Sequence, residues 1–217
     1  MKKLLFFAVV ISFFFWTGCS EFLDRQPLDQ ITEDNFYNTA SDADRAVLSL
    51  YSVTQGINWY GKSWMITEIP SDNTTTGGND PDFSPIDNFT ISSDNGPNTE
   101  FWTEHFRLIT LANQILKQVP KIDMDEDLKN SYLAEARFMR GYSYFDLVRI
   151  YGGVPIIEEV PTIESDLMVE RNSVDEVYEF AIEDLRFAVN NLPETRAASN
   201  LGRATRYAAA ATYLSFI

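Results

Sequence analysis

Cysteine, histidine and basic side chains are scarce in this sequence of 217 residues. One cysteine excludes an internal disulfide framework, a cysteine-based zinc site and an iron–sulfur cluster, because each of these needs several thiolates from the chain. One histidine leaves little room for a histidine-rich metal site. Only 17 Lys and Arg stand against 32 Asp and Glu, for a formal charge of −15. A chain this acidic repels phosphate backbones, so the composition argues against nucleic acid as a partner.

Long hydrophobic runs are also absent, except at the start of the chain. The stretch Leu4–Trp16 is apolar apart from Ser12, and it follows two lysines. It is shorter than the roughly 20 residues that a membrane-spanning helix needs, and its charged start and small final residues are typical of a secretory signal peptide. The stretch leads into Thr17-Gly18-Cys19, which resembles the bacterial lipobox, with Trp16 in place of the usual leucine.

The position of Cys19 predicts a lipid anchor. In a lipobox the cysteine becomes the first mature residue and carries the acyl chains. We therefore expect residues 1–18 to be removed, Cys19 to hold the chain on a lipid bilayer, and residues 19–40 to form a tether. The alternative is a signal that is cut elsewhere and a free, buried Cys19. Because the rest of the chain is acidic, lipid and not charge would hold it at an anionic membrane.

The remainder of the chain is predicted to be helical. Apolar residues recur at helical spacing, and capping residues, glycines and prolines mark the ends. The expected helices span Ser41 to about Tyr51, Thr99 to Val119, Asp127 to Tyr151, Ser173 to Leu192 and Ala204 to Ile217. Alanines and short turns suggest antiparallel helix pairs stacked as in a tetratricopeptide-type array. The pairs lie further apart than the about 34 residues of that repeat, so periodicity alone supports an all-α fold and leaves the array open.

The segment from Gln55 to Asn98 has a different character. It is rich in glycine, proline, threonine and asparagine, and no period persists along it. We interpret it as a long irregular loop region between the first and second helices. Because disordered segments are poor in aromatic residues and this one contains several, we expect the loop region to be ordered.

The loop region holds the candidates for ligand binding. Flat aromatic faces suit the C–H side of a sugar ring, while amides and carboxylates at the rim can bond its hydroxyls. The candidate residues are Trp59, Tyr60, Trp64, Asn73, Asn79 and Asp80. In the alternative interpretation, the aromatic side chains only pin the loop to the helical body. Trp102, on the inward stripe of its helix, is expected in the core.

No catalytic or metal-binding constellation stands out. His105 lies beside Glu104, but without a nucleophile motif or a second histidine we expect a packed or hydrogen-bonded structural residue. The acidic run Asp123–Asp127 lacks the glycine and the closing glutamate of an EF-hand, and a solvated helix start explains it better. Arg137 and Arg140 are expected to pair with acids of adjacent helices. The sequence thus predicts no metal and no cofactor, and it singles out no carboxylate pair for glycoside hydrolysis.

Four segments together resemble the SusD/RagB outer-membrane nutrient-binding lipoproteins. Tyr132–Pro155 is similar to the signature helix of that family, with the residues YLAEARFMRGYSYFDLVRIYGGVP. Cys19–Pro27, Arg171–Pro193 and Gly202–Ala209 are similar, in the same order, to its start and to its next two helices. Family members are usually much longer, and this chain ends in an uncapped hydrophobic helix. We therefore interpret residues 41–217 as an incomplete N-terminal helical domain.

The resemblance implies a function as well as a fold. It implies a tetratricopeptide-like scaffold on the outer face of the outer membrane of a Bacteroidota-type bacterium. It further implies an oligosaccharide ligand, or a peptide in some branches, handed to a SusC-like TonB-dependent transporter without any enzymatic step. Two functions of other classes stay open: a helical-repeat scaffold of an outer-membrane complex that binds no nutrient, and a surface hydrolase.

Overall fold

The computed structural model describes residues 36–78, 80–160, 162 and 169–215, apart from the side chain of Ser63. The chain divides into two compact units, Met1–Phe36 and Tyr37–Ile217, and we describe the second, which we call the helical body. The predicted signal peptide, Cys19 and most of the tether lie outside the described residues. Among the described helices, none is both long enough and apolar enough for a membrane crossing.

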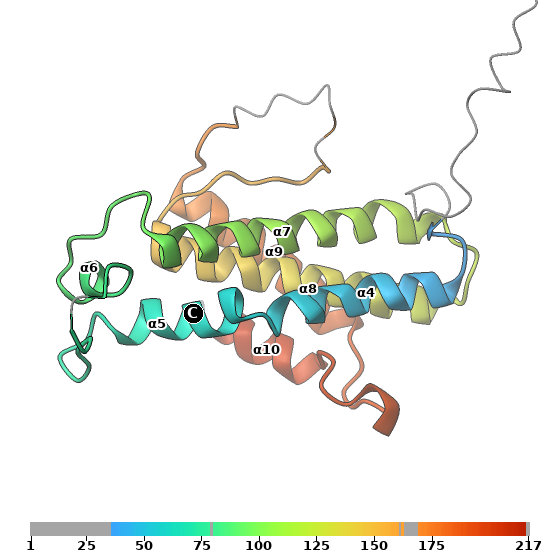
Figure 1. Cartoon of the computed structure of the whole chain (residues 1–217). Helices are drawn as coiled ribbons and strands as arrows, with labels where there is room; N and C mark the ends of the chain where they lie inside the picture. The colour runs from blue at the N-terminus through green and yellow to red at the C-terminus, as the bar shows by residue number, and fades with distance from the viewer. Residues whose placement is uncertain (1–35, 79, 161, 163–168, 216–217) are drawn as a thin grey trace, which may run out of the picture. The chain divides into compact units, whose positions relative to one another are not determined.

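Every regular element in the described residues is helical (Figure 1). The elements are α4 (Ala40–Thr54), the π-helical turn η1 (Ile57–Gly61), α5 (Lys62–Glu68), α6 (Ser84–Asp87), α7 (Gly96–Gln118), η2 (Val119–Lys121), α8 (Glu126–Tyr151), α9 (Val174–Asn191), η3 (Ala198–Asn200) and α10 (Arg206–Leu214). The long helices begin within a few residues of the expected positions.

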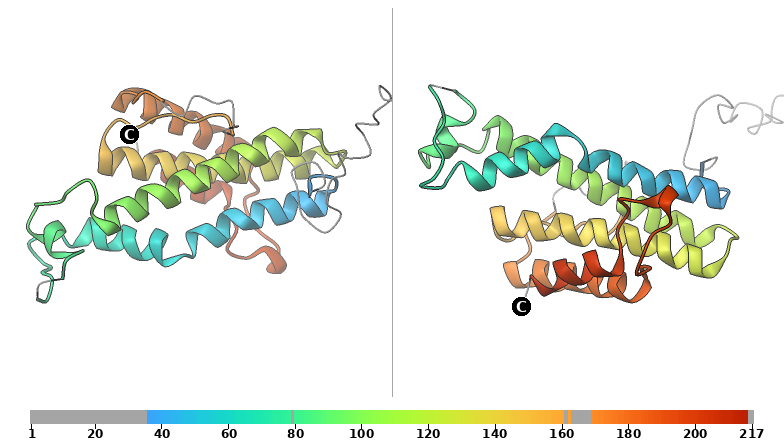
Figure 2. Two further views of the ribbon diagram at one scale, coloured as in Figure 1. Left: turned by 45° about the horizontal axis from the view of Figure 1, so that its top comes forward. Right: turned by 90° about the horizontal axis from the view of Figure 1, so that it is seen from below.

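Successive long helices pack side by side. α7 packs on α8, α8 on α9 and α9 on α10, while α4 contacts both α7 and α8. Two further views of the helical body show α4 beside α7 and the chain reversing direction between α7 and α8 (Figure 2). The prediction of an all-α, tetratricopeptide-like helical-repeat fold is confirmed.

α8 is the central helix, with neighbours on several sides. Apolar residues of α7, α8 and α9 form one buried cluster that includes Ile109, Tyr144 and Val177, and Trp102 packs against it. A Cβ atom added to Gly141 would lie 3.1 Å from the carbonyl oxygen of Ala181. The missing side chain at this glycine therefore allows α8 and α9 to approach closely.

Two buried ionic clusters hold α8 to the other helices. In the first, Arg140 donates to both carboxylate oxygens of Asp184 on α9, at 2.7 and 2.9 Å, and to Oδ1 of Asn113 on α7 at 2.6 Å. Arg137 lies 3.7 Å from the same aspartate. The expectation that Arg137 and Arg140 pair with acids of an adjacent helix is confirmed.

The second ionic cluster surrounds Glu135, whose side chain is fully buried. Its carboxylate accepts from the Tyr51 hydroxyl at 2.6 Å and from Nε and Nη2 of Arg203 at 2.9 Å each. Nη2 of Arg196 forms an ion pair with the same carboxylate at 3.0 Å. The Tyr51 oxygen in turn accepts from the amide of Ala204 at 2.8 Å. This Glu135 cluster therefore joins α4, α8 and the segment before α10.

Helix starts follow the local sequence signals. Ser173 and Glu176 form a capping box at the expected start of α9, and Thr39 with Asp42 forms another at the start of α4. Within the acidic run Asp123–Asp127, Asp125 accepts from the amide of Leu128 at 2.9 Å as the N-cap of α8. The interpretation of that run as a helix start is confirmed.

The irregular region is shorter than the sequence predicted. We expected no regular structure from Gln55 to Asn98, but η1 and α5 make residues 57–68 helical, and the expectation was wrong for this stretch. Glycines and β-branched residues have low helix propensity in isolation. Burial of Trp59 against α7 supplies the tertiary packing that holds the segment helical. The loop proper runs from Ile69 to Asn95, and its described residues form one short helix, α6.

Candidate ligand-binding region

The three candidate aromatic residues lie on η1 and α5, and they differ in exposure: one side chain is buried and two are exposed. Trp59 is 5% exposed, whereas Tyr60 is 75% and Trp64 is 56% exposed. Residues four positions apart on a helix face the same side, so the Tyr60 and Trp64 rings lie on one outer face. We call these two residues the aromatic pair.

Trp59 packs inside the helical body. Its ring stacks on the imidazole of His105 in α7, with ring centroids 3.7 Å apart and an angle of 12° between the planes. Both rings are buried, so Trp59 has no open face for a ligand, and for this residue the pinning interpretation holds. The stack fixes the rotation of η1 about its axis, which turns the aromatic pair outward.

His105 is a structural residue at the base of this region. It is fully buried, and its Nδ1 lies 2.8 Å from the carbonyl oxygen of Phe101. Because a carbonyl only accepts hydrogen bonds, Nδ1 carries a proton. Nε2 lies 3.6 Å from Oδ2 of Asp146, beyond normal hydrogen-bond length. The imidazole thus packs between the buried Trp59 and the Asp146 side chain of α8, away from solvent, in agreement with the expected structural role.

Hydrogen bonds accepted by aspartate side chains order the loop that follows α5. Asp87 accepts from the Thr75 hydroxyl, the Thr76 amide and the Thr76 hydroxyl, each at 3.0 Å. These hydrogen bonds hold the pKa of the Asp87 carboxyl below its usual value, and the two bonds from Thr76 have the largest effect. One oxygen of Asp80 accepts from the amides of Asp82 and Phe83 at 2.9 and 3.1 Å. The loop region is therefore ordered, as its aromatic content predicted.

The polar candidates of the loop are unequally placed. Asn73 and Asp80 are both exposed, although one carboxylate oxygen of Asp80 is engaged with the backbone. Asn79 lies outside the described residues. Exposed side chains can reach a ligand, but Asp80 also has the local role of shaping the turn before α6.

Phe89 is a feature of the loop that our sequence reasoning did not single out. Its side chain is 74% exposed, and its backbone has φ = 55°, in the left-handed region that a bulky residue seldom adopts. Strained backbone of this kind concentrates at functional sites. An aromatic residue within the polar stretch from Asp87 to Thr90 is the sequence signal that could have identified it.

Surface hollows are present on the described part of the helical body, and three of them bear on ligand binding. The α4–α7 groove, of about 370 Å³, is lined by Ser49, Ser52, Val53, Gly56, Ile57, Asn58, Glu104, Arg107 and Leu111. A second hollow, of about 350 Å³, is bordered on α9 by Glu176, Glu179, Phe180 and Glu183. In both, the walls come from elements that are far apart in sequence.

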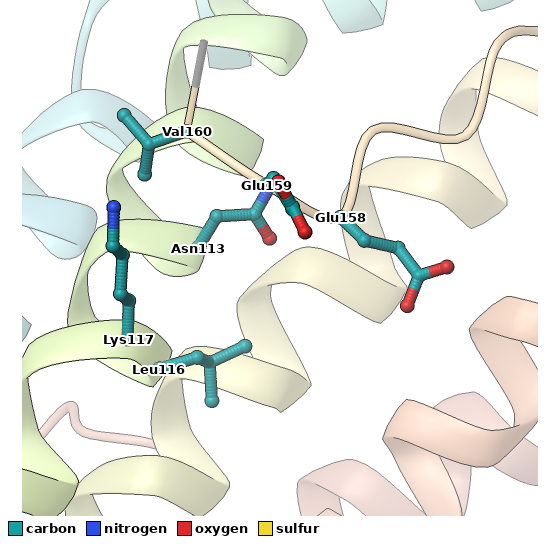
Figure 3. A pocket seen from close by; sticks show the side chains of 6 residues that line it. All are labelled: Asn113, Leu116, Lys117, Glu158, Glu159 and Val160. Carbon is teal, nitrogen blue, oxygen red and sulfur yellow. The ribbon is translucent and has the colours of Figure 1, made fainter. Parts of the chain in front are cut away.

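The third hollow, of about 340 Å³, lies between α7 and residues 158–160 (Figure 3). Asn113 reaches into it from α7, but its amide is already engaged, donating to the carbonyl of Ile157 at 2.7 Å and accepting from Arg140. Glu158 points away from Lys117 in this view. In the described part of the chain, no group of three or more His, Cys, Asp or Glu is placed to hold a metal ion.

Comparison with known proteins agrees with the fold. A SusD-like family model, described as starch-binding and associating with the outer membrane, matches residues 21–216. The chain belongs to this SusD-like family. SusD-like protein P2 of Formosa agariphila is 29% identical over 208 residues, which are 92% of this chain and 40% of the relative. A SusD-like protein of Bacteroides ovatus is 29% identical over 96% of this chain and 37% of the relative.

Solved structures of relatives superpose on the helical body. A laminarin-binding SusD-like protein has a TM-score of 0.75 at 25% identity, over 83% of this chain and 40% of the other. A SusD-like carbohydrate-binding protein of Bacteroides fragilis has a TM-score of 0.73 at 26% identity, over 83% and 37%. The chain therefore spans about 40% of the length of these relatives. SusD-like proteins are binding proteins and not enzymes, and their family is associated with the outer membrane.

Proposed function

We propose that this SusD-like chain captures glycans at the outer surface of the outer membrane, with the aromatic pair as a contact surface for sugar rings. The observation that carries the proposal is the exposure of two large rings on one face of an ordered segment. Exposed aromatic faces are costly in water unless a ligand uses them. The laminarin-binding and carbohydrate-binding relatives support a glycan as the ligand.

Asn73, Asn79 and Asp80 complete the proposed contact surface. Their amides and carboxylate would form hydrogen bonds with the hydroxyls of a sugar that is stacked on the aromatic pair. Trp59 supports the pair from below, through its stack on His105. The proposed mechanism is non-covalent binding, with no catalytic residue.

Two further parts of the proposal concern the place and the partner. Cys19 would carry the lipid that attaches the chain to the outer membrane, and the ligand would pass to a SusC-like TonB-dependent transporter. The match of the family model from residue 21, directly after the lipobox-like motif, supports this arrangement. The transporter would accept the glycan from the aromatic pair or from a surface continuous with it.

The test is glycan binding by the purified chain, measured by calorimetry and affinity electrophoresis. The panel contains laminarin, starch and other neutral polysaccharides, with peptides as a second class of ligand. We expect binding of at least one glycan, and a roughly tenfold or greater loss of affinity when Tyr60→Ala and Trp64→Ala are combined, since each ring contact contributes about 1 kcal/mol.

The control is Tyr207→Ala on α10, which removes a side chain that is 62% exposed and should leave affinity unchanged. Binding of peptides alone would instead favour the peptide-binding branch of the family. If neither class binds, and the chain still co-purifies with a transporter barrel after loss of the aromatic pair, a pure scaffold role replaces the proposal.

A further inference from the structure

We infer that the α4–α7 groove is a second saccharide-binding subsite, which takes the units of a neutral glycan that extend beyond the aromatic pair. This inference rests on the proposed function, because the same glycan must reach both surfaces. It adds a binding site on a different pair of helices, α4 and α7, and a preference for longer chains.

The groove has unused hydrogen-bonding capacity. The Ser52 hydroxyl and the Asn58 amide have no hydrogen-bond partner among the described residues. The Ser49 hydroxyl donates to the carbonyl of Ala46 at 2.6 Å, and its lone pairs can still accept. Hydroxyls and an amide that both donate and accept suit the hydroxyl groups of a sugar. Val53 and Leu111 add an apolar lining for the C–H faces.

The charge balance of the groove favours a neutral ligand. Its two charged residues, Arg107 and Glu104, pair with each other at 3.2 Å, so their charges compensate. The hollow beside α9, by contrast, is bordered by several glutamates with no basic residue in its lining. Of these two hollows, the α4–α7 groove therefore selects less strongly for the charge of a ligand. Hydrogen bonding and shape determine which ligand it binds.

The groove is continuous with the aromatic pair along the chain. Ile57 and Asn58, which line it, belong to η1, the same five-residue turn that presents Tyr60. Side chains three positions apart on a helix surface are neighbours, and Ile57, which lines the groove, is 68% exposed. A ligand over the Tyr60 ring therefore meets the edge of the groove at Ile57. The groove has a volume of about 370 Å³, which lies within the range of small-molecule sites.

The experiment compares glycans of increasing length on wild-type chain and groove variants. The probes are laminarin- and starch-derived oligosaccharides, from the disaccharide to the polymer. In the wild type we expect affinity to rise with chain length. In the combined variant Ser52→Ala with Asn58→Ala we expect long glycans to bind roughly tenfold more weakly, from the loss of two hydrogen bonds, and the disaccharide to bind within about twofold of wild type.

A blocking variant and a matched control separate this loss from misfolding. Ser52→Leu fills the groove from an exposed helical position with a better helix former, and it should flatten the length dependence in the same way. Asn190→Ala with Ser199→Ala removes the same two side-chain types from exposed positions elsewhere and should bind like wild type. Thermal unfolding of each variant checks that the fold is retained.

The outcomes distinguish the groove from the proposed function. Glycan binding that depends on the aromatic pair, combined with an unchanged length dependence in both groove variants, overturns the groove subsite and leaves the proposed function standing. Absence of glycan binding by the wild-type chain at every length overturns both. A selective loss for long glycans in both groove variants supports the inference.

Discussion

Single residues in this molecule carry their largest energetic weight where polar groups are buried. Glu135 is fully buried, yet both of its oxygens accept hydrogen bonds from arginines. An ionised carboxylate in such a place is tolerated only because its partners are present and correctly oriented. The same logic applies to Asp184, where burial raises the pKa of the carboxyl and hydrogen bonds from Arg140 act in the opposite direction.

The first prediction concerns the Glu135 cluster. Glu135→Ala should lower the free energy of unfolding by about 3–5 kcal/mol, because Arg203 and Arg196 would remain buried without their shared acceptor. Urea unfolding followed by circular dichroism measures the change. Glu183→Ala, at an exposed position on α9, is the control and should change the free energy by less than about 0.5 kcal/mol. Equal effects of the two substitutions would contradict the assigned role of the cluster.

The second prediction concerns Gly153, just after α8. A Cβ atom at this position would overlap the carbonyl oxygen of Asn172, a backbone atom that cannot simply move aside. Gly153→Ala should therefore destabilise the chain by about 2 kcal/mol or more. Gly77→Ala is the matched control, since a Cβ there meets no atom within 4 Å. The melting temperatures of the two variants, compared under the same conditions, test the claim. A melting temperature of Gly153→Ala equal to that of the wild type would refute it.

At the scale of elements, some helices are determined by local sequence signals and others by tertiary packing. The starts of α4, α8 and α9 follow capping residues that can be recognised in the sequence, because a cap acts within three positions of itself. The turns η1 and α5 could not be predicted, since they depend on Trp59 stacking on His105, a contact between residues 46 positions apart. The local helix propensity of this segment is low, and the contact with the His105 ring stabilises the helical conformation.

The candidate site was predictable in the same partial way. The sequence indicated the region and the residue types, and Tyr60 and Trp64 are indeed exposed. It could not indicate which of three neighbouring aromatic side chains turns inward, because the π turn of η1 changes the usual helical rotation. The α4–α7 groove was also out of reach, since its walls belong to helices about 50 residues apart that only the fold brings together.

The third prediction concerns the loop and its dependence on pH. The folded-state pKa of Asp87 is lowered, so the ionised carboxylate stabilises the loop fully above the unfolded-state pKa of about 3.9. This stabilisation is lost as the pH falls through the folded-state value, which places the change below about pH 4. Amide hydrogen exchange of Thr76, whose N–H donates to Asp87, should accelerate there relative to the intrinsic rate.

A variant separates Asp87 from the general effects of acid. Asp87→Asn should give fast exchange of the Thr76 amide already at neutral pH, since an amide oxygen is a weaker acceptor than a carboxylate. Asp72→Asn, at an exposed position of the same loop, should leave that amide protected. Protection of Thr76 that survives in Asp87→Asn would show that another acceptor holds the loop.

At the scale of the whole molecule, family membership and the helical fold stand on the full length of the match. Residue patterns could predict helices but not their stacking as an array, because the spacing between helix pairs is irregular. The resemblance of several segments in a fixed order added that information. The contacts from α7 to α10, each helix on the next, show the array directly.

The fourth prediction belongs to this scale because it concerns where the molecule resides. If Cys19 carries the lipid, Cys19→Ala should move the chain from the membrane fraction to the soluble fraction, since the acidic body has no attraction to anionic lipid. Fractionation in a bacterial host that lacks the cognate transporter, followed by immunoblotting, measures the distribution. Cys19→Ala that stays membrane-bound in such a host would rule out the lipid anchor.

The Glu135 cluster also constrains the order in which the chain can acquire its native core. Arg203 pairs with Asp44, 159 positions away, and Tyr51 accepts from the amide of Ala204. These are among the highest-contact-order interactions of the helical body, and they cannot form until residue 204 has been synthesised. Until then, Tyr51 can donate to Glu135 but lacks the amide of Ala204, and Asp44 lacks the guanidinium of Arg203. The final position of α4 therefore depends on residues that lie 153 to 159 positions further along the chain. This part of the core is complete only when two segments far apart in sequence have met.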